Sequence, residues 1–335
     1  MSFNIKEVYA DCAASSPVLP IAFEAMSAAY ARGLGNPNSG HTRGREAHKE
    51  LERCREIIAQ CINASPDEIA FTPSATAACA VGFNACMCSQ RSPYEHKAIS
   101  ELFQFLSTDG YAHMLANNET GERYDLIVQD LSKKNTVFTD ATAAVGQIPV
   151  DVQDLGVQSL AAGAHKFGGY PGIGFIYVRG GVKDDDTFPG TPPVALAMAM
   201  AYSLKYRTVH MKESNEYLYA QQNLLAQAVC NIDGGHVNTP ISGRLPNILS
   251  VRFDGVNARE LLSMLDVNGV YASAGAACSS DADEPSRTLL ASGLTEEEAL
   301  STIRLSFCPE TTPEQFSFVA DALSRCVEKL RRIGE

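Results

Sequence analysis

The stretch Ser159–Val178 constrains the fold most, because it sets a lysine between two apolar segments. Leu160–Ala162 is apolar without helical spacing, and Ile173–Val178 is β-branched and aromatic, so both segments favour buried strands. The loop between them carries His165, Lys166 and several glycines. A lysine there must reach water or a partner, since an unpaired buried ammonium is costly. Two interpretations stay open: an ordinary surface hairpin, or a desolvated amine that attacks an aldehyde and forms a Schiff base.

Size and composition limit the fold and the partners. A chain of 335 residues is too long for one small core and predicts one large domain plus a smaller one. The formal net charge of −12 argues against a nucleic-acid or anionic-membrane surface. The chain has no apolar run long enough for a transmembrane helix and begins without the apolar core of a signal peptide, so we expect a cytoplasmic protein with reduced cysteines. The cysteine spacing predicts no metal site.

Polar side chains follow four predicted strands at the point where each strand ends. They are Thr76 after 68–72, Asn118 after 113–116, Asp140 after 136–139, and Lys166 after 160–162. The segment Pro73–Cys79 also opens a helix, whose first backbone N–H groups suit a phosphate. In a doubly wound α/β sheet, ligands bind beyond the carboxyl ends of the strands. The pattern therefore predicts a cofactor site at that edge.

The remainder of the chain has a mixed α+β pattern, with predicted strands at 245–253 and 302–307 and predicted helices at 258–265 and 312–333. We predict a large domain over 15–235 and a small domain made of 1–14 and 236–335. Within the small domain, Cys278 lies in a loop of small residues, which suits either an exposed nucleophile or a surface thiol. Arg304 is either a surface residue or the bidentate fork for a substrate carboxylate.

Ten motifs follow one another along nearly the whole chain. They are Tyr9–Ala14, Gly35–His41, Phe71–Thr76, Glu95–Ala98, Asn117–Gly121, Asp140, Gly163–Lys166, Gly190–Thr191, Ala276–Ser279 with Glu284–Ser286, and Ile303–Ser306. In this order they resemble the cysteine desulfurase family, a set of pyridoxal-phosphate (PLP) enzymes in the class V aminotransferase group. The resemblance implies the fold-type I α/β architecture: a large domain with a mostly parallel sheet flanked by helices, plus a smaller α+β domain.

The same resemblance implies a reaction and assigns residues to it. L-cysteine would become L-alanine, with the sulfur held as a persulfide on Cys278 for transfer to an acceptor protein. Lys166 would bind PLP covalently and move the substrate α-proton, Asp140 would pair with the ring nitrogen, and His96 would stack on the ring as an acid/base group. The remaining residues fall into two sets. The phosphate would be held by Ser74, Ala75, Thr76 and His165, together with Thr191 of the partner subunit in a homodimer. The substrate would be contacted by Asn36, Asn118 and Arg304, and Asn118 could instead contact the PLP ring.

Several positions depart from the family's pattern. They are Ala77 for Glu, Ala143 for Gln, Gly163 for Ser, Tyr170-Pro171 for a Pro-Lys pair, Phe188-Pro189 in place of a Gly-rich segment with an Arg, and a shortened chain between His96 and Asn117. Each lost hydrogen bond would weaken PLP binding by about 0.5–1.5 kcal/mol. Two alternatives therefore stay open: another PLP enzyme (a selenocysteine lyase, a β-elimination lyase or an aminotransferase), and a degenerate binding or scaffold subunit.

Overall fold

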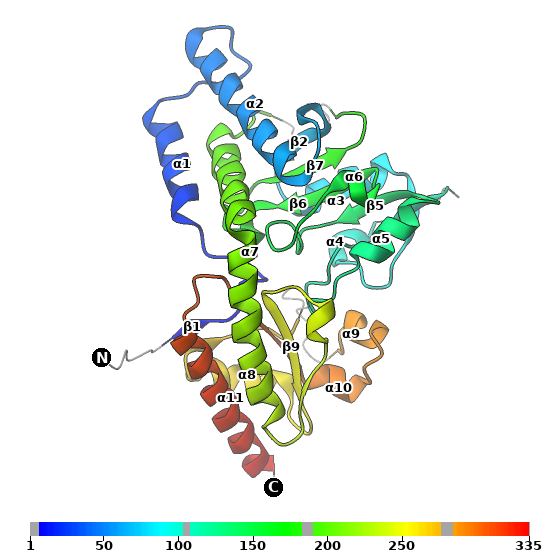
Figure 1. Ribbon diagram of the computed structural model, residues 1–335, viewed down its shortest axis with the longest axis vertical. Coiled ribbons are helices and arrows are strands. Elements are labelled where there is room, and N and C mark those ends of the chain that lie inside the picture. Colours follow the sequence, from blue (N-terminus) through cyan, green and yellow to red (C-terminus); the bar gives the residue numbers. More distant parts are fainter. Residues whose placement is uncertain (1–6, 103–107, 183–189, 276–283, 335) are drawn as a thin grey trace. The chain divides into compact units, whose positions relative to one another are not determined.

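The computed structural model describes residues 7–102, 108–182, 190–275 and 284–334 (Figure 1). The chain forms two compact units. Unit 2 contains residues 15–116 and 124–211, and unit 1 contains residues 1–14, 117–123 and 212–335. The units change over inside helix α7 (Val194–Cys230), so one continuous helix contributes to both. The predicted domain boundary at 235 stays a prediction.

Unit 2 is built on a sheet with the strand order β2-β7-β6-β5-β4-β3. The strands are β2 (Ile69–Thr72), β3 (Cys88–Arg91), β4 (Gly110–Ala112), β5 (Thr136–Asp140), β6 (Ser159–Gly163) and β7 (Gly174–Val178). Neighbours from β3 to β6 are parallel, whereas β7 is antiparallel to both β6 and β2. Every strand of this sheet except β7 therefore points its carboxyl end to the same edge, as the α/β interpretation requires.

The helices of unit 2 are α1 (Pro20–Ala31), α2 (Thr42–Ile62), α3 (Ala75–Ala85), α4 (Lys97–Ser100), α5 (Asp125–Ser132), α6 (Val152–Leu155) and the first part of α7. Short 3-10 turns cover Pro66–Glu68 and Ala164–Lys166. Helix α2 buries Leu51, Cys54 and Ile58 on one face, while Cys61 is half-buried. Helix α3 lies directly on β5, because a Cβ at Gly82 would come within 2.5 Å of the Phe138 ring.

Strand β4 begins and ends earlier than the sequence predicts. The apolar run at 113–116 indicates a strand, but the ladder covers Gly110–Ala112. Beyond Ala112 the chain still pairs with the end of β5, since the backbone N–H of Leu115 donates to the carbonyl of Asp140 at 2.9 Å. Glycine weakens the strand signal at position 110, yet a Cβ there would meet the carbonyl oxygen of Cys86 at 2.2 Å, so the close approach requires it.

Unit 1 has an antiparallel sheet of order β11-β9-β8 and a separate parallel pair, β1 with β10. The strands are β1 (Val8–Tyr9), β8 (Gly235–Val237), β9 (Ile248–Phe253), β10 (Val270–Tyr271) and β11 (Thr302–Ser306). The helices, besides the second part of α7, are α8 (Ala258–Val267), α9 (Arg287–Ala291), α10 (Glu296–Leu300) and α11 (Pro313–Gly334), with a 3-10 turn at Ile241–Gly243.

The core of unit 1 follows the predicted helical spacing. Phe316, Val319, Leu323 and Val327 of α11 are buried in one cluster with residues of β9, β11 and α8, and Leu330 packs against its margin. Each of these side chains contributes about 1.5–3 kcal/mol through its burial. Across the described ranges, we find no helix that is both apolar enough and long enough to cross a bilayer.

Candidate active site

Lys166 lies at the carboxyl-end edge of the unit 2 sheet. It follows β6, which pairs with β7 in an antiparallel hairpin with Gly163 opposite Gly174. Both strands lie inside the sheet, and every residue of β6 is buried. The interpretation as a surface hairpin is therefore wrong. Two side chains fix the backbone at Lys166: Ser16 Oγ donates to its carbonyl oxygen at 2.8 Å, and Gln147 Nε2 does so at 3.3 Å.

His165 is a neutral imidazole at physiological pH. Burial and the adjacent Lys166 cation lower the pKa of His165 to about 4, because both disfavour the imidazolium. A neutral imidazole still offers one N–H donor and one acceptor nitrogen. His165 can therefore donate to an anion without adding a second positive charge beside Lys166.

The amino end of α3 forms an anion-binding edge beside β6. Ser74 caps the helix, and its Oγ accepts the backbone N–H of Ala77 at 3.1 Å. The N–H groups of Ala75 and Thr76 lie in the first turn, where no partner exists inside a helix. An α-helix of this length also presents the positive end of its dipole there.

Two glycines let strands β6 and β7 pack closely on this helix end. A Cβ at Gly174 would come within 3.1 Å of the Ala75 nitrogen, and one at Gly163 would reach the Ala75 Cβ at 2.8 Å and His165 Nδ1 at 3.3 Å. The glycine at 163, which departs from the family's serine, thus lets β6 approach α3 closely. A side chain at either position would push its strand away from the amino end of α3.

Asp140 is the last residue of β5, and its side chain is almost fully buried. Its Oδ1 accepts the backbone N–H of Thr142 at 2.9 Å. Ala143 is half-buried and carries no polar group, so the hydrogen bond of the family's glutamine has no counterpart at that position.

His96 caps α4 with its imidazole. Nδ1 accepts the backbone N–H of Ala98 at 3.1 Å, so the neutral ring carries its proton on Nε2. The nitrogen left for proton transfer is therefore Nε2. Just before it, Glu95 is buried, and its Oε1 accepts the backbone N–H of Met114 at 2.6 Å.

Asn36 and Thr191 form a pair on the surface of unit 2. The Nδ2 of Asn36 lies 3.4 Å from the Oγ1 of Thr191, and both residues are exposed. The sequence assigns these two residues to different tasks, substrate contact and phosphate contact from a partner subunit. The structure places them together in the same chain.

Arg304 and Asn118 meet in unit 1. Arg304 is 2% exposed; its Nη1 donates to the carbonyl oxygen of Asn118 at 2.8 Å, and its Nη2 forms an ion pair with Asp11 Oδ1 at 2.6 Å. A guanidinium has five N–H donors, so these contacts leave donors for a further anion. The ion pair with Asp11 and the backbone hydrogen bonds to Ser273 fix the orientation of the fork.

Cys278 lies outside the described residues, together with the whole motif Ala276–Ser279. The residues on either side of that segment meet Glu119, which is buried. Ser286 Oγ donates to Glu119 Oε2 at 2.5 Å, and a Cβ at Gly275 would come within 2.7 Å of the same oxygen. Glu119 thus joins the two chain segments that flank the predicted nucleophile.

Sequence reasoning gave no separate role to Glu95 and Glu119, which are both buried. In the sequence each of them is only one residue of a longer motif. Their hydrogen-bond partners come from other parts of the chain, Met114 for Glu95 and Ser286 for Glu119, so no local pattern reports them.

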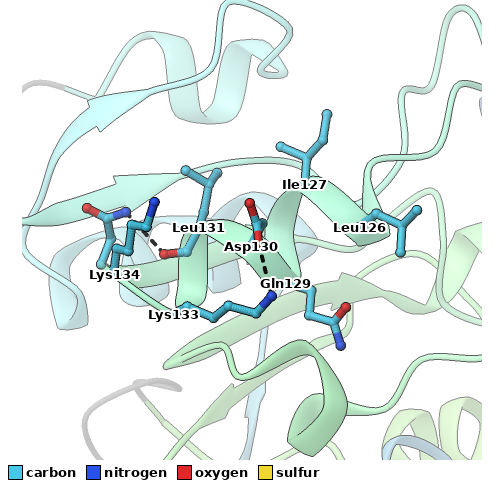
Figure 2. A pocket seen from close by; sticks show the side chains of 8 residues that line it. Leu126, Ile127, Gln129, Asp130, Leu131, Lys133 and Lys134 are labelled. Carbon is cyan, nitrogen blue, oxygen red and sulfur yellow. Dashed lines mark hydrogen bonds and ion pairs between the residues drawn. The ribbon is translucent and has the colours of Figure 1, made fainter.

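A shallow pocket on α5 is a different feature from this edge (Figure 2). Its lining comes from residues 126–135, among which Leu126 is 76% exposed and Ile127 is 48% exposed. Two of its charged groups form an ion pair, since Lys133 Nζ lies 2.9 Å from Asp130 Oδ1. The lining includes none of the predicted site residues, and we do not assign it a role.

The sheet order and the lysine after β6 agree with the fold-type I architecture. The sequence model of the family Aminotransferase class-V matches residues 8–100, 95–186 and 182–319, and it accounts for most of the chain. A relative named Cysteine desulfurase IscS, from Dictyoglomus turgidum, is 33% identical, with 98% of this chain and 96% of the relative covered. The chain therefore belongs to the class-V aminotransferase family, in its cysteine desulfurase group, whose members depend on PLP.

Two further comparisons agree with this assignment. A protein named Cysteine desulfurase IscS from Methanosarcina thermophila is 28% identical, with 100% of this chain and 95% of the relative covered. A solved structure titled NIFS-LIKE PROTEIN superposes with a TM-score of 0.85 at 26% identity and covers 97% of this chain and 100% of its own. The alignment with the Dictyoglomus protein spans 382 positions, so that relative has segments that this 335-residue chain lacks.

Proposed function

We propose that this protein is a PLP-dependent cysteine desulfurase that converts L-cysteine to L-alanine and passes the sulfur, as a persulfide on Cys278, to an acceptor protein. The observation that carries the proposal is the shared edge of the unit 2 sheet. There the backbone of Lys166 is fixed after β6, a buried carboxylate ends β5, and an open helix terminus follows β2. A lysine, a carboxylate and an anion-binding helix end are the donor set that PLP requires.

The residues of this edge fit the cofactor group by group. The amino end of α3, on which Gly163 and Gly174 pack closely, would hold the phosphate, with donors from Ala75, Thr76 and His165 and the helix cap at Ser74. Asp140 supplies a negative charge for a protonated ring nitrogen. When bound, PLP supplies an electron sink next to the substrate Cα.

Proton handling falls to two residues of unit 2. The amine of Lys166 holds the cofactor and then moves the α-proton of the substrate. His96, whose Nδ1 is occupied by the Ala98 N–H, exchanges protons through Nε2. Its ring also supplies a flat surface against which the cofactor ring stacks.

Substrate recognition and sulfur removal fall to residues of unit 1 and to Asn36. Arg304 binds the substrate carboxylate with the donors that Asp11 and Asn118 leave free, and the Asn118 and Asn36 amides contact the substrate. The thiolate of Cys278 attacks the substrate sulfur. The Cβ–S bond breaks, an S–S bond forms on Cys278, and Cβ takes up a proton, which yields alanine.

We also propose that the enzyme acts as a homodimer in the cytosol. Thr191 is exposed, and its hydroxyl lies beside Asn36, so it is available to a second copy of the chain. In the dimer, Thr191 of the partner subunit adds a donor to the phosphate site. Size-exclusion chromatography with light scattering tests the dimer, and a monomeric holoenzyme would refute it.

The visible absorption spectrum of the purified protein, before and after L-cysteine is added, tests the proposal. We expect a cofactor band that shifts with cysteine, and its covalent retention after borohydride reduction in wild type but not in Lys166→Ala. Cys278→Ala should abolish sulfide release with a thiol reductant, and the exposed Cys230→Ala should leave it unchanged. Alanine formation that survives Cys278→Ala would indicate a direct lyase, and a protein that stays colourless with added PLP would indicate a scaffold subunit.

A further inference from the structure

Ser16 holds the chain on both sides of the Lys166 Cα. Its backbone N–H donates to the carbonyl oxygen of His165 at 2.8 Å, and its Oγ donates to the carbonyl oxygen of Lys166, also at 2.8 Å. The first carbonyl belongs to the peptide group before the Cα of Lys166, and the second belongs to the peptide group after it. Because each peptide group is planar, holding both carbonyls restrains the φ and ψ angles of Lys166. Ser16 therefore sets the direction in which the lysine side chain leaves the backbone.

Further donors act on the same loop. Gln147 Nε2 donates to the carbonyl oxygen of Lys166 at 3.3 Å, from the turns that follow β5. At the other end of the loop, the carbonyl oxygen of Gly168 accepts the backbone N–H of Leu19 at 2.9 Å and the Oγ of Ser203 at 3.2 Å. These donors come from three separate stretches of unit 2: the segment before α1, the turns after β5, and helix α7. The lysine loop is thus held from outside the β6–β7 hairpin to which it belongs.

Both side chains that reach the Lys166 carbonyl are buried. Ser16 is 7% exposed and Gln147 is 8% exposed. A buried hydroxyl or amide that loses its acceptor costs free energy, because water cannot readily take the acceptor's place. The two hydrogen bonds are therefore kept in the folded chain, and a substitution that removes one donor weakens the hold on the lysine backbone.

We propose that Ser16 and Gln147 are positioning residues for Lys166, and that Ser16 is the stronger of the two because it restrains both peptide groups. This inference rests on the proposed function, in which the amine of Lys166 holds PLP and then moves the α-proton of the substrate. A lysine side chain has several rotatable bonds, so its reach is reproducible only if the backbone from which it starts is fixed. Reacting atoms must approach to about 3–3.5 Å in the right direction, and a shift of about 1 Å costs much of the rate. Both residues act through the backbone of Lys166.

Hydrogen–deuterium exchange of the cofactor-free full chain tests whether Ser16 holds the loop. The backbone N–H groups of Phe167 and Gly169 both donate to the carbonyl oxygen of Ala164, so their exchange reports on the closed form of the loop. Ser16→Ala should make the peptide that contains them exchange at least about threefold faster, because the net contribution of a hydrogen bond is lost. Ser16→Thr keeps the hydroxyl and should exchange as wild type does. The matched control is Ser15→Ala, at the exposed neighbouring position, which should change nothing.

The holoenzyme tests whether this hold matters for the cofactor. We expect Ser16→Ala to lower kcat for L-cysteine roughly threefold to tenfold, with KM within about threefold of wild type, because the proposed substrate contacts are made by other side chains. The visible circular dichroism of the cofactor band, divided by its absorbance, should also fall, since a looser Lys166 holds the ring in more orientations. Ser16→Thr should restore both values. Gln147→Met, which keeps the size and removes the donor, should change both in the same direction by a smaller factor.

The two measurements separate the failure of this inference from that of the proposed function. Faster exchange in Ser16→Ala combined with unchanged kcat and circular dichroism would overturn the positioning role and leave the proposed function intact. Unchanged exchange, or an equal effect in Ser15→Ala or Ser16→Thr, would overturn the hold of the Ser16 hydroxyl on the loop. A wild-type chain that binds no PLP would refute the proposed function and, with it, the positioning role. Should Ser16→Ala fail to fold, Gln147→Met decides, and a Gln147→Met holoenzyme that matches wild type would overturn the inference.

Discussion

Glu95→Gln replaces a buried ionisable side chain with a neutral one and is expected to stabilise the protein at neutral pH. Burial, followed by repulsion from Asp140, raises the pKa of Glu95 from 4.5 to about 8. Between these two values the folded chain holds a proton on Glu95 that the unfolded chain has released. Because the folded state binds more protons, the free energy of unfolding falls as the pH rises through this window.

The slope of the unfolding free energy against pH gives the size of the effect of Glu95. One bound proton corresponds to about 1.4 kcal/mol per pH unit, so at pH 7 the carboxyl lowers the stability by up to about 3 kcal/mol relative to pH below 4.5. Glutamine imitates the protonated acid, keeps an oxygen for the Met114 N–H, and has no proton to lose. Its advantage over wild type should be small at pH 5, reach up to about 3 kcal/mol at pH 7, and level off above pH 8.

Urea unfolding of the cofactor-free chain, followed by far-ultraviolet circular dichroism at pH 5, 6, 7 and 8, measures this difference. The matched control is Glu101→Gln, an exposed glutamate whose side chain lies beside Lys97, and its effect should stay within about 0.5 kcal/mol at each pH. A Glu95→Gln advantage that does not grow between pH 5 and pH 7 would refute the reasoning, since it would mean that Glu95 titrates normally in the folded chain.

Three other substitutions have definite expected outcomes. Gly163→Ser should lower the melting temperature and reduce the free energy of unfolding by about 1–3 kcal/mol, because the new Cβ would lie 2.8 Å from the Cβ of Ala75. Adding Ala75→Gly should restore part of that stability. A Gly163→Ser protein as stable as wild type would contradict this prediction. Arg304→Lys should raise the KM for L-cysteine at least tenfold with a smaller change in kcat, as steady-state kinetics will show, because lysine cannot span Asp11 and a substrate carboxylate together. Finally, the pKa of His165 is lowered from the usual histidine value of 6.5 to about 4. Between these two pH values the unfolded chain binds a proton that the folded chain does not. The cofactor-free protein should therefore lose stability as the pH falls from 6.5 to 4. His165→Gln should lose less stability over the same range in thermal unfolding, and an equal loss would exclude His165 as the cause.

The stretch around Lys166 was predictable because its signals are local. The β-branched run at 173–178, the apolar run at 160–162 and the glycines between them indicate a hairpin, and the structure has β6 and β7 there. The burial of this hairpin could not be predicted from its own residues. Whether the hairpin lies inside or outside a sheet depends on β2 and β5, which come from elsewhere in the chain.

The predicted site residues show the same division. Asp140 was predictable because it ends a strand, whereas the hydrogen bond of buried Glu95 to the Met114 N–H depends on another part of the chain. The start of β4 was missed because Gly110 gives no strand signal while serving a close backbone approach. The roles given to Cys278, Arg304 and the other site residues stay predictions for the experiments above.

The pairing of β1 with β10 also bears on how the protein is made. Val8 lies opposite Val270, so the first strand of the chain waits for a partner that leaves the ribosome some 260 residues later. At roughly 5–20 residues per second, that interval is on the order of ten to fifty seconds. Unit 2 can close its own sheet once β7 has emerged, long before this, because β2 and β7 pair within it. During synthesis Val8 and Ala10, which are buried in the core of the folded unit 1, therefore stay without their later partners for that time.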